Sequence, residues 1–206
     1  MTLTFFLEML GTAAFAVSGA LAAARKGMDI FGFLVLAVLP AVAGGTLRDL
    51  ILDRVPVFWV ADVRYVSVAM IAAVIVYVTA YEPGGRRQVL IWMDAMGLAL
   101  FAALGAQVSL QHGAGAIVAI MLGVTTAVAG GMIRDVICNE IPLILRGEIY
   151  ATAAFVASTV LVAGSLVGLR AQVALGLAVL CGLSVRASAI VFGWSLPQAR
   201  RSKTKL

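Results

Sequence analysis

Apolar residues come in long continuous runs along the whole chain, and short polar turns separate them. Seven runs can be delimited, at roughly 3–24, 30–52, 62–81, 89–110, 114–137, 149–168 and 172–194. Each approaches the length of about 20 residues with which an α-helix crosses a hydrocarbon core. Strands of a membrane barrel would be shorter and would alternate apolar with polar residues. The pattern therefore predicts an all-α integral membrane protein with seven transmembrane helices.

Composition agrees with this class and excludes a water-soluble one. Of the 206 residues, 63% are hydrophobic and only 12% are charged, and the mean hydropathy is +1.07. A soluble domain with this balance would lack a polar surface. The formal net charge of +5 is interpreted as a topology signal and not as a nucleic-acid footprint, because basic residues of membrane proteins first of all set orientation. The expected surroundings are membrane lipid, with no nucleic-acid partner.

Lysine and arginine gather in alternate connections between the runs. Seven spans place the two termini on opposite sides of the membrane. One side would hold the C-terminal tail and the turns with Arg25, Lys26, Arg86, Arg87, Arg146, Arg200, Arg201, Lys203 and Lys205. The other side would hold only Arg54, Arg64 and Arg170. The positive-inside rule then predicts a multi-pass protein of the prokaryotic plasma (inner) membrane, with its N-terminus outside and its C-terminus cytoplasmic.

One ten-residue motif occurs twice. It reads AVAGGTLRDL at Ala41–Leu50 and AVAGGMIRDV at Ala127–Val136. Sliding the chain on itself by 86 residues aligns the two copies without a gap, and about a third of the positions match over about 50 residues. The same shift aligns Pro56 with Pro142. A chain that is rich in a few apolar residue types matches itself more often by chance. Chance does not explain two G-G-x-x-R-D motifs and a matched proline. The chain therefore contains an internal duplication.

The repeat unit spans three helices, which is an odd number. The second copy therefore enters the membrane from the opposite side. We expect a first three-helix repeat over residues 1–85, a second, inverted repeat over 86–170, and a seventh helix with a basic cytoplasmic tail over 171–206. Inverted repeats are common in membrane transporters, where the solute path lies at the interface of the repeats.

The glycine pairs Gly44-Gly45 and Gly130-Gly131 allow two interpretations. Adjacent glycines weaken a helix by about 1 kcal/mol each, which favours a kink whose freed carbonyls line a path. Small residues also let two membrane helices pack tightly. Because the pairs recur with charged residues in inverted copies, we favour path-lining kinks, one near each face of the membrane.

The charged pairs Arg48-Asp49 and Arg134-Asp135 follow the glycines within each motif. A charge at the bilayer centre costs about 2.5–3.5 kcal/mol on insertion scales. Neighbouring residues lie about 100° apart around a helix, so we expect each arginine not to face its aspartate. Each charge would then need a partner elsewhere or a water-filled cavity. Alternatively, the two arginines snorkel to the interface, since each lies late in its span.

Four further residues are weaker candidates for the mouth of a path or for the path itself. Glu8 and Asp94 are repeat equivalents, both acidic, and either attract cations or complement a helix N-terminus. Arg186 lies well inside the seventh span and either pairs with a carboxylate of a repeat or snorkels inward. Ser18 would hydrate a path, although serine is ordinary in membrane helices.

No enzyme constellation is visible in the sequence. Catalysis needs a positioned nucleophile, base or metal cluster, and the chain has one histidine and two isolated cysteines. We expect no cofactor and no resident metal ion.

The doubled A-G-G-x-x-R-D, the three-plus-three-plus-one plan and the compact length resemble the trimeric intracellular cation (TRIC) channel family, in its small prokaryotic branch. The resemblance covers about residues 7–194. It implies a homotrimer with one pore inside each protomer, lined by the second and fifth helices at kinked glycine motifs, and conduction of monovalent cations, chiefly K⁺. Many members carry a third glycine where this chain has Ala43 and Ala129, so the kink here would be milder.

Two functions remain open from the sequence. The first is a K⁺ channel. The second is a secondary transporter of a small neutral solute such as glycine, because related prokaryotic sequences have also been classed as glycine transporters. A channel would give single-channel current steps, and a transporter would give saturable flux coupled to an ion gradient.

Overall fold

The computed structural model describes residues 3–79 and 86–197. Its elements are α1 (Leu3–Arg25), α2 (Ile30–Ile51), α3 (Phe58–Ala61), α4 (Arg64–Thr79), α5 (Arg86–Gln111), α6 (Ala116–Ile137), the 3-10 turn η1 (Leu143–Leu145), α7 (Ala151–Leu166) and α8 (Ala171–Phe192). The expected basic residues of the tail, at 200–205, lie outside the described residues.

The predicted class is confirmed, because seven long helices match the seven predicted spans to within a few residues. Five of them (α1, α2, α5, α6 and α8) are long and apolar enough to cross a membrane, and α4 and α7 are apolar but shorter, with 16 residues each. Two short elements were not expected. α3 and η1 lie in the connections that follow α2 and α6, close to the matched prolines.

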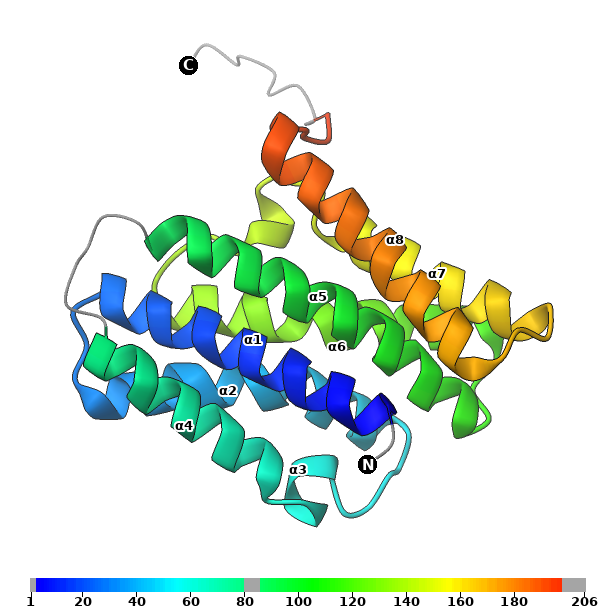
Figure 1. The fold of residues 1–206 in the computed structure, drawn as a ribbon, viewed down its shortest axis with the longest axis horizontal. Coiled ribbons are helices and arrows are strands. Elements are labelled where there is room, and N and C mark those ends of the chain that lie inside the picture. The colour runs from blue at the N-terminus through cyan, green and yellow to red at the C-terminus, as the bar shows by residue number, and fades with distance from the viewer. Residues whose placement is uncertain (1–2, 80–85, 198–206) are drawn as a thin grey trace, which may run out of the picture.

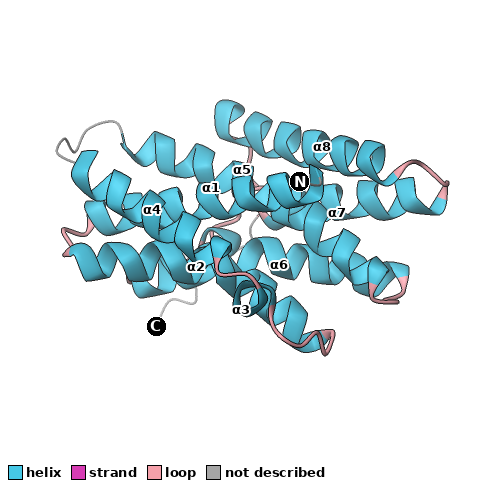
Figure 2. Ribbon diagram, turned by 60° about the horizontal axis from the view of Figure 1, so that its bottom comes forward, coloured by secondary structure: helices cyan, strands magenta, loops and turns pink. Residues whose placement is uncertain are grey.

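The helices form one bundle with its long elements side by side (Figure 1). α1 packs against α2, α4 and α5, while α6 packs against α2, α5 and α7. α8 packs against α7 and α5 and lies along one side of the bundle in both views (Figures 1 and 2). The short helix α3 lies against the end of α2 (Figure 2).

The two repeats have closely matching backbones. α2 and α6 have the same bounds after a shift of 86 residues, and both end in the same way. The amide of Leu52 bonds to the carbonyls of Arg48 and Leu50, and that of Cys138 bonds to the equivalent pair. One residue further on, Asp53 and Asn139 take the left-handed conformation, with φ of 52° and 53°. In Figure 1, α1 and α5 run in opposite directions, as an inverted repeat requires.

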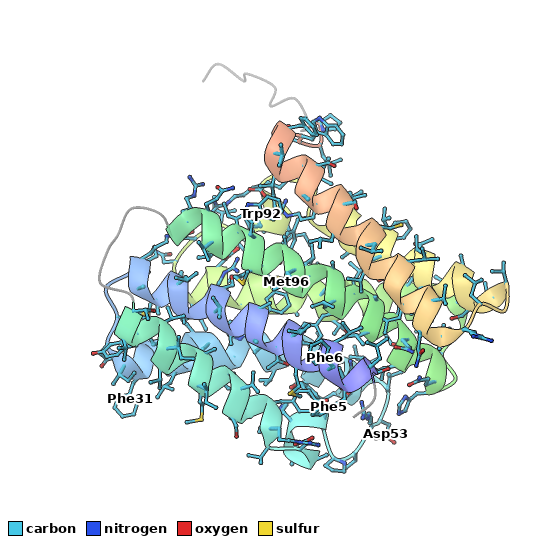
Figure 3. All side chains as sticks on the ribbon, in the orientation of Figure 1. Phe5, Phe6, Phe31, Asp53, Trp92 and Met96 are labelled. Atoms are coloured by element: carbon cyan, nitrogen blue, oxygen red, sulfur yellow. The ribbon has the colours of Figure 1, made fainter. Side chains whose placement is uncertain are left out.

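The bundle has two ends, which we name by their arginines. At the Arg48 end, α1 begins and α2 ends; at the Arg134 end, α1 ends and α6 ends. Figure 3 shows Phe31, at the start of α2, and Asp53, just past its end, on opposite sides of the molecule. α2 therefore spans the bundle from one end to the other.

Equivalent residues of the two repeats meet in the core. The rings of Phe15 and Phe101 stack with centroids 5.6 Å apart and planes 8° from parallel. Gly11 leaves room for the ring of Phe101, and Gly97 leaves room for that of Phe15. The pseudo-two-fold axis of the inverted repeat therefore passes between these rings. Buried alanines fill much of the remaining core, and such small residues let membrane helices approach closely.

Candidate functional site

The first glycine of each pair is a contact between the two repeats. A Cβ at Gly44 would collide with the main-chain oxygen of Thr126, and one at Gly130 would collide with that of Pro40. Thr126 and Pro40 are themselves repeat equivalents, so α2 and α6 cross symmetrically at these glycines. Both helices continue without interruption through the pairs. At Gly44 and Gly130 the packing interpretation is therefore the one that the contacts support.

Pro40 is a helix-bending residue that the sequence analysis did not use. It lies inside α2, where its missing N–H leaves the carbonyl of Leu36 without its helical donor. Gly19 of α1 lies directly over that carbonyl, so closely that a Cβ there would collide with its oxygen. Prolines are a frequent cause of bends in long helices. Pro40 therefore weakens the hydrogen-bond ladder of α2 one turn before the glycine pair.

The prediction that each arginine would not face its neighbouring aspartate is wrong. Nε and Nη2 of Arg48 both donate to Oδ1 of Asp49, at 2.9 and 2.6 Å. Arg134 makes the same two bonds to Asp135, at 2.9 and 2.8 Å. The 100° spacing describes where side chains start, and the long arginine side chain curls back far enough to cross it. Both arginines are buried, at 4% and 2% exposure, so neither snorkels.

A larger cluster surrounds Arg134. Its Nη1 donates to Oδ1 of Asp94 at 2.5 Å and to Oγ of Ser18 at 2.6 Å. The hydroxyl of Tyr150 also donates to Asp94 Oδ1, at 3.4 Å. Arg134 thereby ties α6 to α5 and α1. The structure brings three of the predicted residues, Ser18, Asp94 and Asp135, to one guanidinium group.

Negative charge exceeds positive charge in this Arg134 cluster. One guanidinium faces the two carboxylates of Asp94 and Asp135, and all three side chains are buried. Asp135 Oδ2 accepts from the amide of Leu143 at 3.0 Å. Asp94 Oδ2 is buried and has no hydrogen-bond partner among the described residues. The cluster therefore carries a carboxylate oxygen without a donor from the part of the chain that the structure describes.

A cavity of about 260 Å³ opens at the Arg134 end. Arg134 and Asp135 form part of its wall, together with Arg25, Arg87, Glu140 and Glu148. This volume holds several water molecules, since one needs about 10–15 Å³ by this kind of measure. The charges of the second motif are therefore reached from a polar vestibule.

The Arg48 end is closed by comparison. Glu8 accepts a hydrogen bond from the hydroxyl of Tyr65 at 2.5 Å and makes no ion pair with Arg48. Asp49 Oδ2 accepts from the amide of Phe58 at 2.9 Å, and Arg54 lies 3.6 Å from Oδ1. The cavity that Glu8 and Arg48 share measures only about 10 Å³. It has room for about one water molecule.

The second glycine of each pair faces these polar sites. A Cβ at Gly45 would lie 2.5 Å from the ring of Phe58. One at Gly131 would collide with the hydroxyl of Tyr150 and would lie 3.3 Å from Asp94 Oδ1. Gly45 and Gly131 thus lie beside the charge clusters, whereas Gly44 and Gly130 lie at the helix crossing.

Arg186 of α8 pairs with a carboxylate of the second repeat. Its Nη2 lies 2.8 Å from Oε2 of Glu148, and its Nη1 donates to the carbonyl of Ile149 at 3.2 Å. The guanidinium also lies over the ring of Tyr150, 5.1 Å from the centroid. Of the two expected alternatives, the structure shows pairing with a carboxylate of a repeat and not snorkelling. Through Tyr150, Arg186 is one contact away from Asp94.

Glu140 joins the two repeats at the mouth of the vestibule. It lies 2.7 Å from Arg25, 3.2 Å from Lys26 and 3.6 Å from Arg146. Burial raises the pKa of the carboxyl, but the hydrogen bond from Lys26 and the charges of the three basic groups outweigh it, so the pKa is lowered. The carboxylate is thus held ionised between α1 and the segment after α6.

Sequence reasoning missed Phe58, Tyr65, Tyr150 and Glu140. Phe58 follows two residues after the repeat-matched Pro56, which was the one signal that this connection has a fixed structure. The tyrosines and Glu140 have no equivalent of the same type at a shift of 86, so the repeat did not reveal them. Among the described residues there is no group of three or more His, Cys, Asp or Glu side chains that would hold a metal ion.

Comparisons with known proteins agree with this architecture. A family model described as "Glycine transporter" matches residues 5–81 and 91–165. The chain is 46% identical over 162 residues to the UPF0126 inner membrane protein YadS of Escherichia coli K12, covering 77% of each protein. It is 40% identical over 200 residues to a UPF0126 membrane protein of Vibrio cholerae, covering 95% of this chain and 82% of that one.

Among solved structures, the chain is similar to the TRIC trimeric intracellular cation channel orthologue from Rhodobacter sphaeroides. The TM-score is 0.90 and the identity 44%, over 94% of this chain and 100% of that chain. The chain is therefore a multi-pass membrane protein that belongs to the TRIC family, in the prokaryotic branch that the family model describes as "Glycine transporter".

Proposed function

We propose that this protein is a channel for monovalent cations, K⁺ first among them, and not an enzyme. In this proposal it assembles as a homotrimer, and each protomer carries one path lined by α2 and α6. The observation that carries the proposal is the pair of buried Arg–Asp clusters, Arg48-Asp49 and Arg134-Asp135, which inverted repeats place at opposite ends of one bundle. Charges inside a membrane segment are costly, and they commonly mark an ion or solute pathway.

Electrostatics favours a cation over an anion. The Arg134 cluster has one more carboxylate than it has guanidinium groups, and Asp94 Oδ2 has no donor among the described residues. Carboxylate oxygens near a pore raise the local concentration of cations. The vestibule wall carries both arginines and glutamates, so the excess of carboxylates belongs to the buried cluster behind it.

Similarity supports the same activity. The Rhodobacter sphaeroides protein is described as a trimeric cation channel, and this chain shares 44% of its residues and its fold. Many apolar side chains of α2, α4 and α8 are exposed in the single chain and are available to lipid or to neighbouring protomers. The trimer and the K⁺ preference are carried over from that similarity and from the sequence motif.

A second candidate is secondary transport of a small neutral solute such as glycine. The description of the matched family model favours it, as does the unequal state of the two ends. A transporter opens one end at a time, whereas a conducting channel opens both. In either case we place the protein in the plasma membrane with the Arg48 end outside and the Arg134 end in the cytoplasm, as the basic residues of the turns indicate.

A recording from purified protein in a planar bilayer tests the proposal. We expect discrete current steps in KCl, with a reversal potential that follows the K⁺ gradient. Proteoliposomes without a channel current but with saturable glycine uptake would favour the transporter.

Assembly and orientation have tests of their own. Cross-linking in detergent that stops at a dimer would contradict the trimer. A cysteine at position 3 that is labelled only from the cytoplasmic side would contradict the orientation.

A further inference from the structure

An aromatic ring seals the Arg48 end. The side chain of Phe58 is buried and lies over Gly45, where even a Cβ would come within 2.5 Å of the ring. Tyr65 meets the ring edge-on at 4.7 Å between centroids. The guanidinium of Arg48 lies 5.8 Å from the ring centroid. Phe58 thus lies against both Gly45 and the arginine of the first motif.

The helix that carries this ring is held on α2 by two hydrogen bonds. The amide of Phe58 donates to Oδ2 of Asp49 at 2.9 Å, and the indole Nε1 of Trp59 donates to Oγ1 of Thr46 at 2.9 Å. Both acceptors belong to the last turns of α2, close to the Gly-Gly pair. α3 is a single turn that packs on α2 and α4, and Phe5 and Met9 of α1 pack against the small cluster of Val42, Phe58 and Tyr65. The two hydrogen bonds and this small cluster would have to break for α3 to move.

The inverted repeat supplies an internal control. At the Arg134 end, the residue equivalent to Phe58 is Ile144, which is only partly buried. The amide donated to Asp135 Oδ2 comes from Leu143, so the hydrogen bond to the motif is kept. The group that meets Gly131 is the hydroxyl of Tyr150, whereas Gly45 meets the apolar ring of Phe58. The space beside the Arg134 motif measures about 260 Å³, against about 10 Å³ beside Arg48.

We propose that Phe58 is the gate of the Arg48 end. Its ring closes the path above Gly45 and Arg48, and the path opens when α3 moves away from α2. Thr46 and Asp49 act as positioning residues that hold the gate shut through Trp59 and the Phe58 amide. This inference rests on the proposed path through the protomer and adds to it a named closing residue.

Two readouts test the gate. The first is single-channel current from Phe58→Ala, Phe58→Leu and Trp59→Phe, with Ile144→Ala as the matched control in the other repeat. We expect Phe58→Ala to raise the ratio of open to closed time at least about tenfold, a change that corresponds to about 1.4 kcal/mol. Phe58→Leu should restore most of the closure, because leucine still fills the space over Gly45. Ile144→Ala should behave like the parent.

Trp59→Phe removes the hydrogen bond to Thr46, which we call the tether, and keeps an aromatic ring. It should therefore raise the ratio of open to closed time by a smaller factor than Phe58→Ala does. Thr46→Val removes the acceptor of the same hydrogen bond. The double variant should therefore open no more than Trp59→Phe alone, whereas independent effects would multiply. This cycle tests the tether in proteins whose Phe58 is intact.

The second readout does not depend on current. Leu104 lines the small cavity behind the ring, so Leu104→Cys is placed in a background with Cys138→Ala and Cys181→Ala. A membrane-impermeant cationic thiol reagent is added from the Arg48 side of oriented vesicles. We expect slow labelling with Phe58 present and at least about tenfold faster labelling with Phe58→Ala. This factor equals the expected change in the ratio of open to closed time.

Parent-like labelling and parent-like opening in the Phe58→Ala and Trp59→Phe variants would overturn the gate. Faster labelling in a conducting protein whose currents do not change would also overturn it, because Phe58 would then only cover a blind cavity. If the parent itself carries no current, the proposed function fails, and the gate is still decided by the labelling rate. Detergent-stable assembly and unchanged thermal unfolding identify variants that remain folded.

Discussion

The two ends of the bundle are built from the same ten-residue motif, yet the cavity beside the motif measures about 260 Å³ at the Arg134 end and about 10 Å³ at the Arg48 end. At the Arg134 end, the arginine binds Asp94 and Ser18 as well as its neighbour Asp135, and a vestibule reaches this cluster. At the Arg48 end, the acidic equivalent Glu8 is held by Tyr65, and an aromatic ring fills the space. The backbone around both motifs is the same, down to the left-handed residue after each helix.

The difference shows which parts of the motif are structural and which depend on their surroundings. Gly44 and Gly130 have the same role in both repeats, because each lets α2 and α6 cross at main-chain contact. The Arg–Asp hydrogen bonds are also shared. What differs is contributed from outside the motif, by α1, α4, α5 and the two connecting segments. The duplication supplies a symmetric frame, and these contributions make its two ends unequal.

The largest expected effect is the loss of the second carboxylate around Arg134. Asp94→Asn removes a buried partner of a buried guanidinium, which costs about 3 kcal/mol, whereas Glu8→Gln leaves Arg48 with Asp49 and costs about 1 kcal/mol. Unfolding titrations in mixed micelles with increasing denaturing detergent measure both. Equal losses at the two ends would show that the Arg134 cluster is no more coupled than its counterpart.

The next effect concerns the helix crossing. Gly44→Ala and Gly130→Ala place a methyl group against a main-chain oxygen that has no freedom to move, so each should destabilise the protein by about 2 kcal/mol. Gly176→Ala is the matched control, because nothing lies near that position and alanine favours a helix by up to about 1 kcal/mol. If Gly44→Ala and Gly176→Ala unfold at the same denaturant concentration, the crossing is not the contact described above.

Much of the fold follows from the sequence, because hydrophobic length and a matched shift of 86 residues are local or repeated signals. Seven spans and their inversion could be predicted, whereas the pore role of Gly44, Arg48 and their equivalents stays a prediction. The pairing of side chains could not be predicted. The Arg48–Asp49 contact depends on how a flexible side chain curls, and the partner of Glu8, Tyr65, comes from a helix more than 50 residues away. Phe58 lies in a connection whose single helical turn is too short to give a periodic hydrophobic pattern.

A smaller effect is expected from pH at the mouth of the vestibule. The pKa of Glu140 is lowered in the folded protein, so its ion pairs contribute stability above the ordinary pKa of about 4.5, and this contribution is lost as the pH falls through the folded pKa. Thermal unfolding of the parent should therefore drop more between pH 6 and pH 3.5 than that of Glu140→Gln. Parallel curves for the two proteins would mean that Glu140 does not join the repeats.

The central claim is that a cation path runs through each protomer beside the second glycine of each pair. The most direct test is the unitary K⁺ current of Gly45→Leu and Gly131→Leu in planar bilayers, beside Gly176→Leu as a control. Leucine adds bulk next to the charge clusters and no polar group, so insertion and assembly should survive while the current falls to below about a tenth of the parent value, given that interior space admits little extra volume. Parent-like currents from both variants, with their assemblies intact, would contradict the account and place the path elsewhere.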